Sequence, residues 1–226
     1  MSAVSLALPF DGRWLVQNSP ARRVPSHGLD MLGQRYAIDF VAVDERGRTA
    51  QTRDWRTALA TESPERFFGF GLPILAPVDG VVVHTHDGER DHEARRSQLA
   101  LIPYALGQAS RLRLGPNALA GNRVMIRDHV SGRLVALVHL RSGSLRVGIG
   151  DEVETGEPLA ECGNSGNSTQ PHVHVQVMDN ADLHVAQGVP LVFTHYRQWG
   201  PARGAVEDMD IGIPAERAIV SSLPSL

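Results

Sequence analysis

The sequence of 226 residues has no lysine, a single cysteine at position 162 and few aromatic residues. One cysteine excludes an internal disulfide and a cysteine-rich structural zinc site, so any bound metal must be held by His, Asp or Glu. The formal net charge is only −3. Because this balance gives no strong electrostatic attraction to nucleic acid or to anionic membranes, we expect neither as a partner.

Long apolar runs are also missing. The N-terminal segment MSAVSLALPFDGRW lacks a basic region, and Pro9 and Asp11 interrupt its apolar run, which is not the pattern of a signal peptide or a membrane span. The sequence therefore predicts a cytoplasmic protein, or a periplasmic or extracellular one if a leader was removed. The length is typical of one substantial domain. We predict a domain at 1–200 with a core at about 18–180, and a loosely structured tail at 201–226 packed on it.

Short β-branched runs between Gly, Pro, Asn and Asp dominate the chain and predict a mainly β fold, an antiparallel sheet or sandwich. The expected strands are 36–43, 80–86, 122–128, 133–140, 158–162, 172–179 and 189–196. Helical periodicity is weak except at 54–60 and 93–106. Residues 87–116 mix charged and apolar residues, and we interpret them as an inserted loop or helical segment, either a wall of a substrate groove or a plain surface insertion.

The most distinctive pattern is GNSGNSTQPHVHVQV at residues 163–177. Side chains alternate along a strand, so His172 and His174 share one face while the intervening valines point to the other, where they can be buried. Two adjacent imidazoles, continued by Gln176, suit one zinc ligand beside one group that handles protons. Alone, the pattern also fits two surface histidines on a half-exposed strand.

A catalytic zinc ion takes three protein ligands and leaves a fourth position for water. Besides His174, the candidates are His27, in a loop, and Asp39, in a predicted strand. Burying an acidic residue between apolar neighbours costs roughly several kcal/mol without a cation or donors, and a metal would offset that cost. The alternative for Asp39 is an edge strand that faces water. Asp30, close after His27, is a competing carboxylate.

Three other histidines need an interpretation. His139 closes the apolar run LVALVHL, and taken alone it fits a core or rim histidine. His84 and His86 repeat the His-x-His spacing and are the main rival pair for a metal. Because no Gly/Ser-rich loop leads into that pair, we interpret it as structural or solvent-facing.

An ordered series of motifs resembles the lysostaphin-type zinc endopeptidases, a family of peptidoglycan-cleaving hydrolases. The motifs are His27 followed by QRYAIDF, then LPILAPVDGVVV, NRVMIRDHVSGRLVALVHL, VGIGDEVETGEPLAECGNSGNS and QPHVHVQVMD. The resemblance spans roughly residues 18–180. It implies an antiparallel sheet crossed by a groove with one zinc ion on its floor.

Carried over by motif, the family's ligands fall on His27, Asp39 and His174, and its two non-ligand histidines fall on His139 and His172. In the better-known branch the first His and the Asp are only a few residues apart, as in HxGxD. The wider spacing here leaves Asp39 and Asp30 both open as the carboxylate ligand.

The resemblance implies a zinc-dependent endopeptidase acting on peptide bonds, with peptidoglycan cross-links as the substrate. Its water would be activated by the metal and assisted by His139 and His172, either of which could be the base. The alternative is a non-catalytic cell-wall-binding or regulatory module that retains zinc. The stretch LRVGIGDEVETGEPLAE is also similar to biotinyl and lipoyl carrier domains, but a chain without lysine has no attachment site for those cofactors.

Overall fold

The computed structural model describes residues 2–52, 54, 57, 60–95, 116–200 and 205–223. Its architecture is mainly β and mostly antiparallel, which confirms the predicted fold class. Short helical elements occur at η1 (Pro64–Arg66) and α4 (Pro116–Ala120). No helix in the described ranges is long and apolar enough to cross a membrane.

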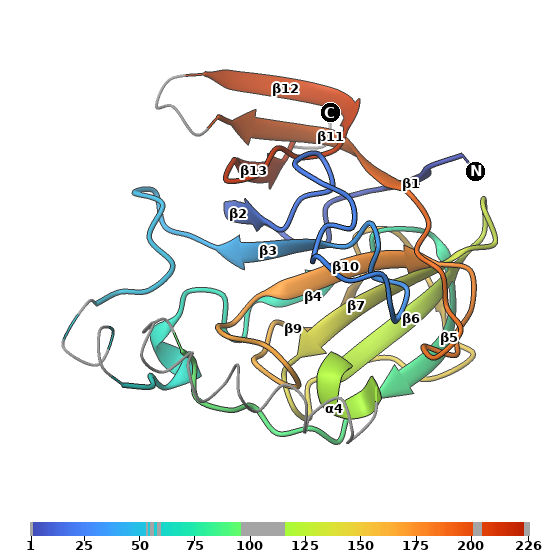
Figure 1. Cartoon of the computed structure of the whole chain (residues 1–226), viewed down its shortest axis with the longest axis horizontal. Coiled ribbons are helices and arrows are strands. Elements are labelled where there is room, and N and C mark those ends of the chain that lie inside the picture. The colour runs from blue at the N-terminus through green and yellow to red at the C-terminus, as the bar shows by residue number, and fades with distance from the viewer. Residues whose placement is uncertain are drawn as a thin grey trace.

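One large sheet joins eleven strands of the described chain (Figure 1). The strand order is β1 (Val4–Leu6), β11 (Leu191–Trp199), β13 (Ile219–Ser222), β2 (Trp14–Gln17), β3 (Ile38–Ala42), β10 (Val173–Met178), β7 (Leu134–Leu140), β6 (Asn122–Asp128), β5 (Gly80–His86) and β8 (Glu152–Val153), with β12 (Val206–Gly212) paired to β11. Only the pairing of β1 with β11 is parallel among these strands. Two further strands, β4 (Pro73–Leu75) and β9 (Pro158–Glu161), form a separate antiparallel pair.

The local sequence pattern predicts most of the strands that build the site. The expected strands 80–86 and 122–128 coincide with β5 and β6, because turn residues bound both β-branched runs. Residues 55, 56, 58 and 59 of the expected helix 54–60, and most of 93–106, fall outside the described residues. The described start of the second helix, 93–95, is not helical, since Ala94 forms an antiparallel bridge with Glu62.

The C-terminal region contradicts the prediction of a loosely structured tail. Both β12 and β13 lie within 201–226, and β13 is an interior strand between β11 and β2. Val220 pairs with Trp14 and belongs to the main core, so burial of apolar area fixes this strand. Pro214, one of the residues that suggested a tail, lies between the two strands, where its missing N–H is tolerated.

One face of the sheet carries the main apolar core, which also includes residues of β4 and β9. Phe40 of β3 is fully buried there, with its ring centroid 5.0 Å from that of Phe10 and 5.3 Å from that of Phe193. On β10, Val173 and Val175 point into the same core. Because side chains alternate, the polar residues of β3 and β10 must lie on the opposite face.

The described part of the insertion, 87–95, is anchored to neighbouring loops. A carboxylate oxygen of Asp91 accepts a hydrogen bond from the backbone N–H of Asn164 at 2.6 Å, and the other accepts from Ser142 N–H at 3.0 Å. The side-chain oxygen of Asn122 accepts from the backbone N–H of Gly88 and Glu89. The segment therefore braces the Gly/Ser-rich loop that precedes β10.

Candidate metal centre

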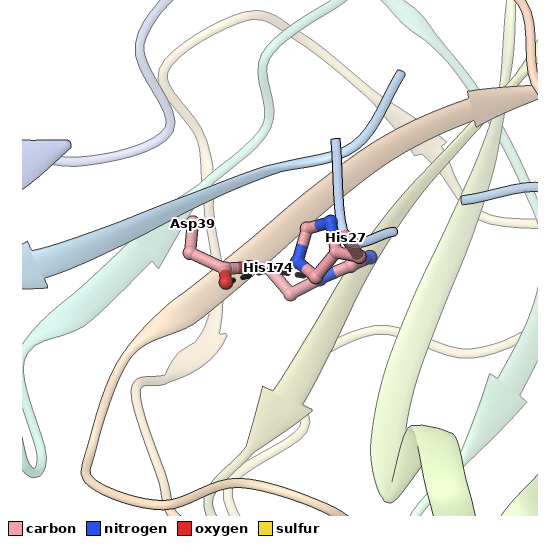
Figure 2. Close-up of side chains that lie close together, drawn as sticks. All are labelled: His27, Asp39 and His174. Atoms are coloured by element: carbon pink, nitrogen blue, oxygen red, sulfur yellow. Dashed lines mark hydrogen bonds and ion pairs between the residues drawn. The ribbon is translucent and has the colours of Figure 1, made fainter. Parts of the chain in front are cut away.

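Three segments far apart in sequence bring His27, Asp39 and His174 together (Figure 2). One potential ligand atom from each residue lies within 4.8 Å of the other two. Asp39 on β3 is directly opposite His174 on β10 in the antiparallel register. Since the apolar residues of both strands face the main core, these two polar side chains share the other face.

A loop carries His27 over this face. The backbone N–H of Ser26 donates to the carbonyl oxygen of Arg35 at 3.0 Å, which closes the loop back onto the start of β3. The side chain of Ser26 is buried, with its hydroxyl oxygen 3.0 Å from Nδ1 of His27. This anchoring directs Nε2 of His27 toward Asp39.

The carboxylate of Asp39 is the centre of the cluster. Oδ2 lies 3.0 Å from Nε2 of His27, and Oδ1 lies 2.9 Å from Nδ1 of His174 and 3.7 Å from Nε2 of His172. Asn18 donates to Oδ2 from its side-chain amide at 2.7 Å. Asn18 was not singled out from the sequence, where an isolated Asn after a short strand carries no motif.

The amide of Gln176 fixes the proton on His174. Its Nε2 donates to the carbonyl oxygen of Leu32 at 2.9 Å, so its Oε1 is the atom that faces Nε2 of His174, also at 2.9 Å. An amide oxygen only accepts hydrogen bonds, so Nε2 of His174 is the donor. In the neutral ring, the lone pair of Nδ1 then faces the carboxylate of Asp39.

Backbone carbonyl groups orient His139 and His172 in the same way. Nδ1 of His139 lies 2.9 Å from the carbonyl oxygen of Ser165, and Nδ1 of His172 lies 2.8 Å from that of Gln170. Both Nδ1 atoms must therefore donate, which leaves Nε2 as the basic nitrogen of each neutral ring. The two ring centroids are 4.8 Å apart, and that of His139 is 5.9 Å from that of His174.

A β-bulge places His139 on the site face. Regular alternation along β7 would direct it into the main core, where Val135 and Leu137 point. Instead the register with β6 shifts opposite His139, which has a φ of +66°. The extra residue keeps His139 on the same face as Val138 and returns Leu140 to the core. Such a backbone conformation costs on the order of 1–3 kcal/mol and is found at functional positions.

Burial and neighbouring charges set the pKa values of the cluster. Burial alone would raise the pKa of Asp39, but the charges of His27 and His172 and hydrogen bonding with His174 and His27 hold it well below its usual range. Burial lowers the pKa of His139 well below its ordinary value, and His172 and His174 reinforce this through repulsion. Burial also lowers the pKa of His172. His27 differs: burial lowers its pKa, but attraction to the carboxylate of Asp39 and the hydrogen bond that His27 donates to it outweigh burial and raise the pKa.

This set of donors fits a zinc ion. Two imidazole nitrogens and one carboxylate oxygen are the ligand types of catalytic zinc sites. With Nε2 of His174 committed to Gln176, a lone pair on Nδ1 and a carboxylate oxygen of Asp39 face one another. Two acceptors at this distance repel each other unless a proton or a cation lies between them, and a buried metal ion would remove that conflict.

A cavity of about 300 Å³ opens beside the cluster. Its polar wall includes His27, Asp39, His139, His172 and His174, and its apolar wall includes Leu29, Met31, Leu119, Met125 and Val138. A chain of small or aliphatic residues would therefore fit against the apolar wall while one backbone carbonyl faces the histidines.

The alternative ligands of the sequence analysis lie elsewhere. Asp30 has an exposed side chain that pairs with Arg35. Asp39 does not face water on an edge strand, because β3 is interior and the residue is only 5% exposed. On β5, His84 accepts a hydrogen bond from Arg123, and neither it nor His86 belongs to a group in the described chain that could hold a metal.

Part of the chain, including three of the clustered histidines, matches the model of a known family. Residues 104–186 match the model of peptidase family M23. They contain His139, His172 and His174, whereas His27 and Asp39 precede the matched segment and join the cluster through the fold.

Similar solved structures include three M23 or lysostaphin peptidases. The catalytic domain of the antimicrobial peptidase lysostaphin from Staphylococcus simulans is 18% identical over 68% of this chain and 74% of its own, with a TM-score of 0.38. A variant catalytic domain of the prophage-encoded M23 protein EnpA from Enterococcus faecalis is 20% identical over 63% and 81%, with a TM-score of 0.36. The M23 metalloprotease pseudoalterin from the deep sea is 16% identical over 84% and 76%, with a TM-score of 0.42. Residues 104–186 of this chain are therefore similar to peptidase family M23.

Proposed function

We propose that this protein is a zinc-dependent endopeptidase that hydrolyses peptide bonds in peptidoglycan cross-links. The observation that carries the proposal is the convergence of three imidazoles on the buried carboxylate of Asp39, with the ring of His139 beside them, at the wall of a cavity. The order of the motifs shared with lysostaphin-type endopeptidases favours peptidoglycan as the source of the peptide.

In this proposal His27, Asp39 and His174 hold one zinc ion. Nε2 of His27 and Nδ1 of His174 are the nitrogens that face the carboxylate, while Gln176 fixes the ring of His174 from its other side. Such acceptor contacts to the outer nitrogen of a ligating histidine hold its orientation. When bound, zinc lowers the pKa of a water to about 7 and polarises the carbonyl of the scissile bond.

His139 and His172 handle the proton of the attacking water and the charge on the carbonyl oxygen. Their Nδ1 atoms are held by carbonyl groups, so Nε2 of each ring is the atom that accepts a proton. Burial keeps both rings neutral near pH 7 by lowering their pKa values. A neutral ring is ready to act as a base, and once protonated it is a donor to an oxyanion or a leaving amine.

Metal analysis tests the proposed ligands. The protein is loaded with zinc, dialysed and assayed alongside His174→Ala and a control, His184→Ala, whose residue is exposed and outside the cluster. We expect one zinc per chain in the wild type and in the control, and none in His174→Ala. Equal zinc in all three proteins would contradict the site.

Digestion of purified cell-wall sacculi separates the enzyme from the non-catalytic alternative. His172→Ala should retain zinc and lose roughly 10²–10⁴ in the rate of peptide release, the range for removing a general acid–base group. Sacculi that bind the wild type without any release of peptides would instead support a cell-wall-binding or regulatory module.

A further inference from the structure

Arg123 on β6 is a buried arginine on the same face as the metal cluster. It is 4% exposed and contributes to the wall of the same cavity. The register places it directly opposite Val138 on β7, and Val138 is directly opposite His174 on β10. Arg123 therefore lies two strands away from a proposed zinc ligand, in one row across the sheet.

The hydrogen-bond partners of Arg123 are all neutral acceptors. One terminal nitrogen donates to the side-chain oxygen of Asn117 at 2.7 Å and to Nε2 of His84 at 3.0 Å. The other donates to the carbonyl oxygen of Gly121 at 3.2 Å. The buried Nε has no hydrogen-bond partner in the described part of the chain. Burial and repulsion from Arg123 lower the pKa of His84, so its ring accepts this hydrogen bond as a neutral imidazole.

No carboxylate in the described ranges forms an ion pair with Arg123, and these ranges contain every Asp and Glu of the sequence. A buried guanidinium is normally paired with an anion, because its desolvation is otherwise unfavourable. The charge of Glu89 attracts Arg123 but forms no ion pair with it in the described ranges, so the positive charge in the cavity wall has no carboxylate in direct contact. An incoming ligand could supply that contact.

We infer that Arg123 receives a carboxylate of the bound peptide and thereby selects substrates with a negative charge close to the scissile bond. The inference rests on the proposed peptidase function. A carboxylate is favoured over the neutral polar groups of a peptide, because it forms a charge-assisted hydrogen bond with an N–H group of the guanidinium that Asn117, His84 and Gly121 leave free.

The spacing limits where this carboxylate lies along the substrate. Neighbouring strands are about 4.8 Å apart, so the backbone positions of Arg123 and His174 are separated by roughly 10 Å. An extended peptide spans that distance in about three residues. Val138 and Met125 form part of the apolar wall of the same cavity. This wall suits an aliphatic side chain of the substrate next to its carboxylate.

Binding measured without metal tests the inference independently of catalysis. The probes are dansyl-Ala-Leu-Ala-Ala with a free carboxyl terminus or a terminal amide, and dansyl-Ala-Glu-Ala-Ala-amide with its Gln counterpart. Fluorescence anisotropy in excess EDTA gives the Kd of each peptide for the full chain. The first pair reports on a terminal carboxylate, and the second on an acidic side chain.

We expect the carboxylate form of at least one pair to bind roughly tenfold to a hundredfold more tightly than its amide, the range of a charge-assisted hydrogen bond. Arg123→Met should abolish this preference, and Arg123→Lys should retain part of it. The control is Arg127→Met, which removes an exposed arginine from the same strand and should leave the preference intact.

Three results would overturn the inference: equal Kd values within both pairs, no binding of any peptide up to millimolar concentration, or a preference that survives Arg123→Met. The wild-type comparison stands even if Arg123→Met fails to fold. Cleavage of sacculi by a protein that shows no carboxylate preference would reject only this inference. A preference without cleavage would reject only the peptidase.

Discussion

Three of the four clustered imidazoles have one ring nitrogen committed to an oxygen that only accepts. Those oxygens belong to Gln176, Ser165 and Gln170. At the scale of single residues, these contacts decide which nitrogen of each ring is free for a metal or a proton. Gln176 therefore orients the ring of His174, although it contacts neither Asp39 nor His27.

Removing the acceptor beside His174 should weaken zinc binding. Gln176→Leu is expected to lower zinc affinity by roughly tenfold to a hundredfold, because the ligand ring loses its orientation. Gln176→Glu keeps an accepting oxygen and should bind zinc at least as tightly as the wild type. Competition with a fluorescent chelator measures both affinities. Unchanged affinity in Gln176→Leu would show that the ring is held by other contacts.

His139 should make the stability of the metal-free protein depend on pH. Burial holds the pKa of His139 well below its ordinary value, so the unfolded chain binds a proton near pH 6.5 that the folded chain does not. Stability is therefore lost as pH falls below about 6.5, by up to about 1.4 kcal/mol per pH unit from this residue.

Denaturant unfolding in EDTA at a series of pH values measures this effect against His139→Gln. The variant should lose less stability than the wild type between pH 7 and pH 5. His27 acts with the opposite sign in both proteins, because its raised pKa gives stability that is present at low pH and lost as pH rises. Parallel curves for the two proteins would mean that His139 is protonated equally in the folded and unfolded states.

At the scale of elements, the Gly/Ser-rich loop before β10 has to pass very close to the end of β7. A Cβ on Gly163 would meet backbone atoms of Arg141 at 2.4 Å, closer than any ordinary contact. The same loop supplies the carbonyl oxygens of Ser165 and Gln170 that orient His139 and His172. The glycine therefore permits the approach on which the site depends.

Gly163→Ala should destabilise the protein by about 2 kcal/mol or more, since backbone atoms cannot move aside cheaply. The matched control is Gly148→Ala, where a Cβ would meet only Asp151 Oδ2 at 3.8 Å. That variant should stay within about 1 kcal/mol of the wild type. Denaturant midpoints of the three proteins decide the matter, and equal losses in both variants would contradict the close approach.

At the scale of the whole molecule, a metal would add a link among β3, β10 and the loop of His27. The two strands already pair with each other in the sheet, and the carboxylate of Asp39 contacts both His27 and His174. A ligand that binds only the folded state stabilises it by about 2.7 kcal/mol at a hundredfold excess over its Kd. Zinc should therefore raise the Tm by roughly 5–10 °C in a chain of this length.

Thermal melts with zinc and with EDTA test this coupling, with Asp39→Asn as the variant. The zinc-dependent rise in Tm should disappear in Asp39→Asn, because an amide replaces the charged ligand. Arg127→Met should show the full rise, since its residue lies outside the cluster. A rise of equal size in Asp39→Asn would place the stabilising zinc elsewhere on the protein.

The local sequence by itself determined the β class, the positions of β5 and β6, and the shared face of His172 and His174. Each of these depends on a period of two and on turn residues within a few positions, so a short window contains the necessary information. The motif order added His27, Asp39 and His139 as partners.

Only the tertiary structure decided which carboxylate joins the histidines, how His139 reaches the site and that β13 is an interior strand. Asp39 rather than Asp30 lies in the cluster because β3 pairs with β10 in a particular register. His139 faces the cavity because a bulge against β6 reverses the alternation of β7. Register and bulges arise from pairing between segments distant in sequence, and the burial of apolar area across the whole sheet selects them.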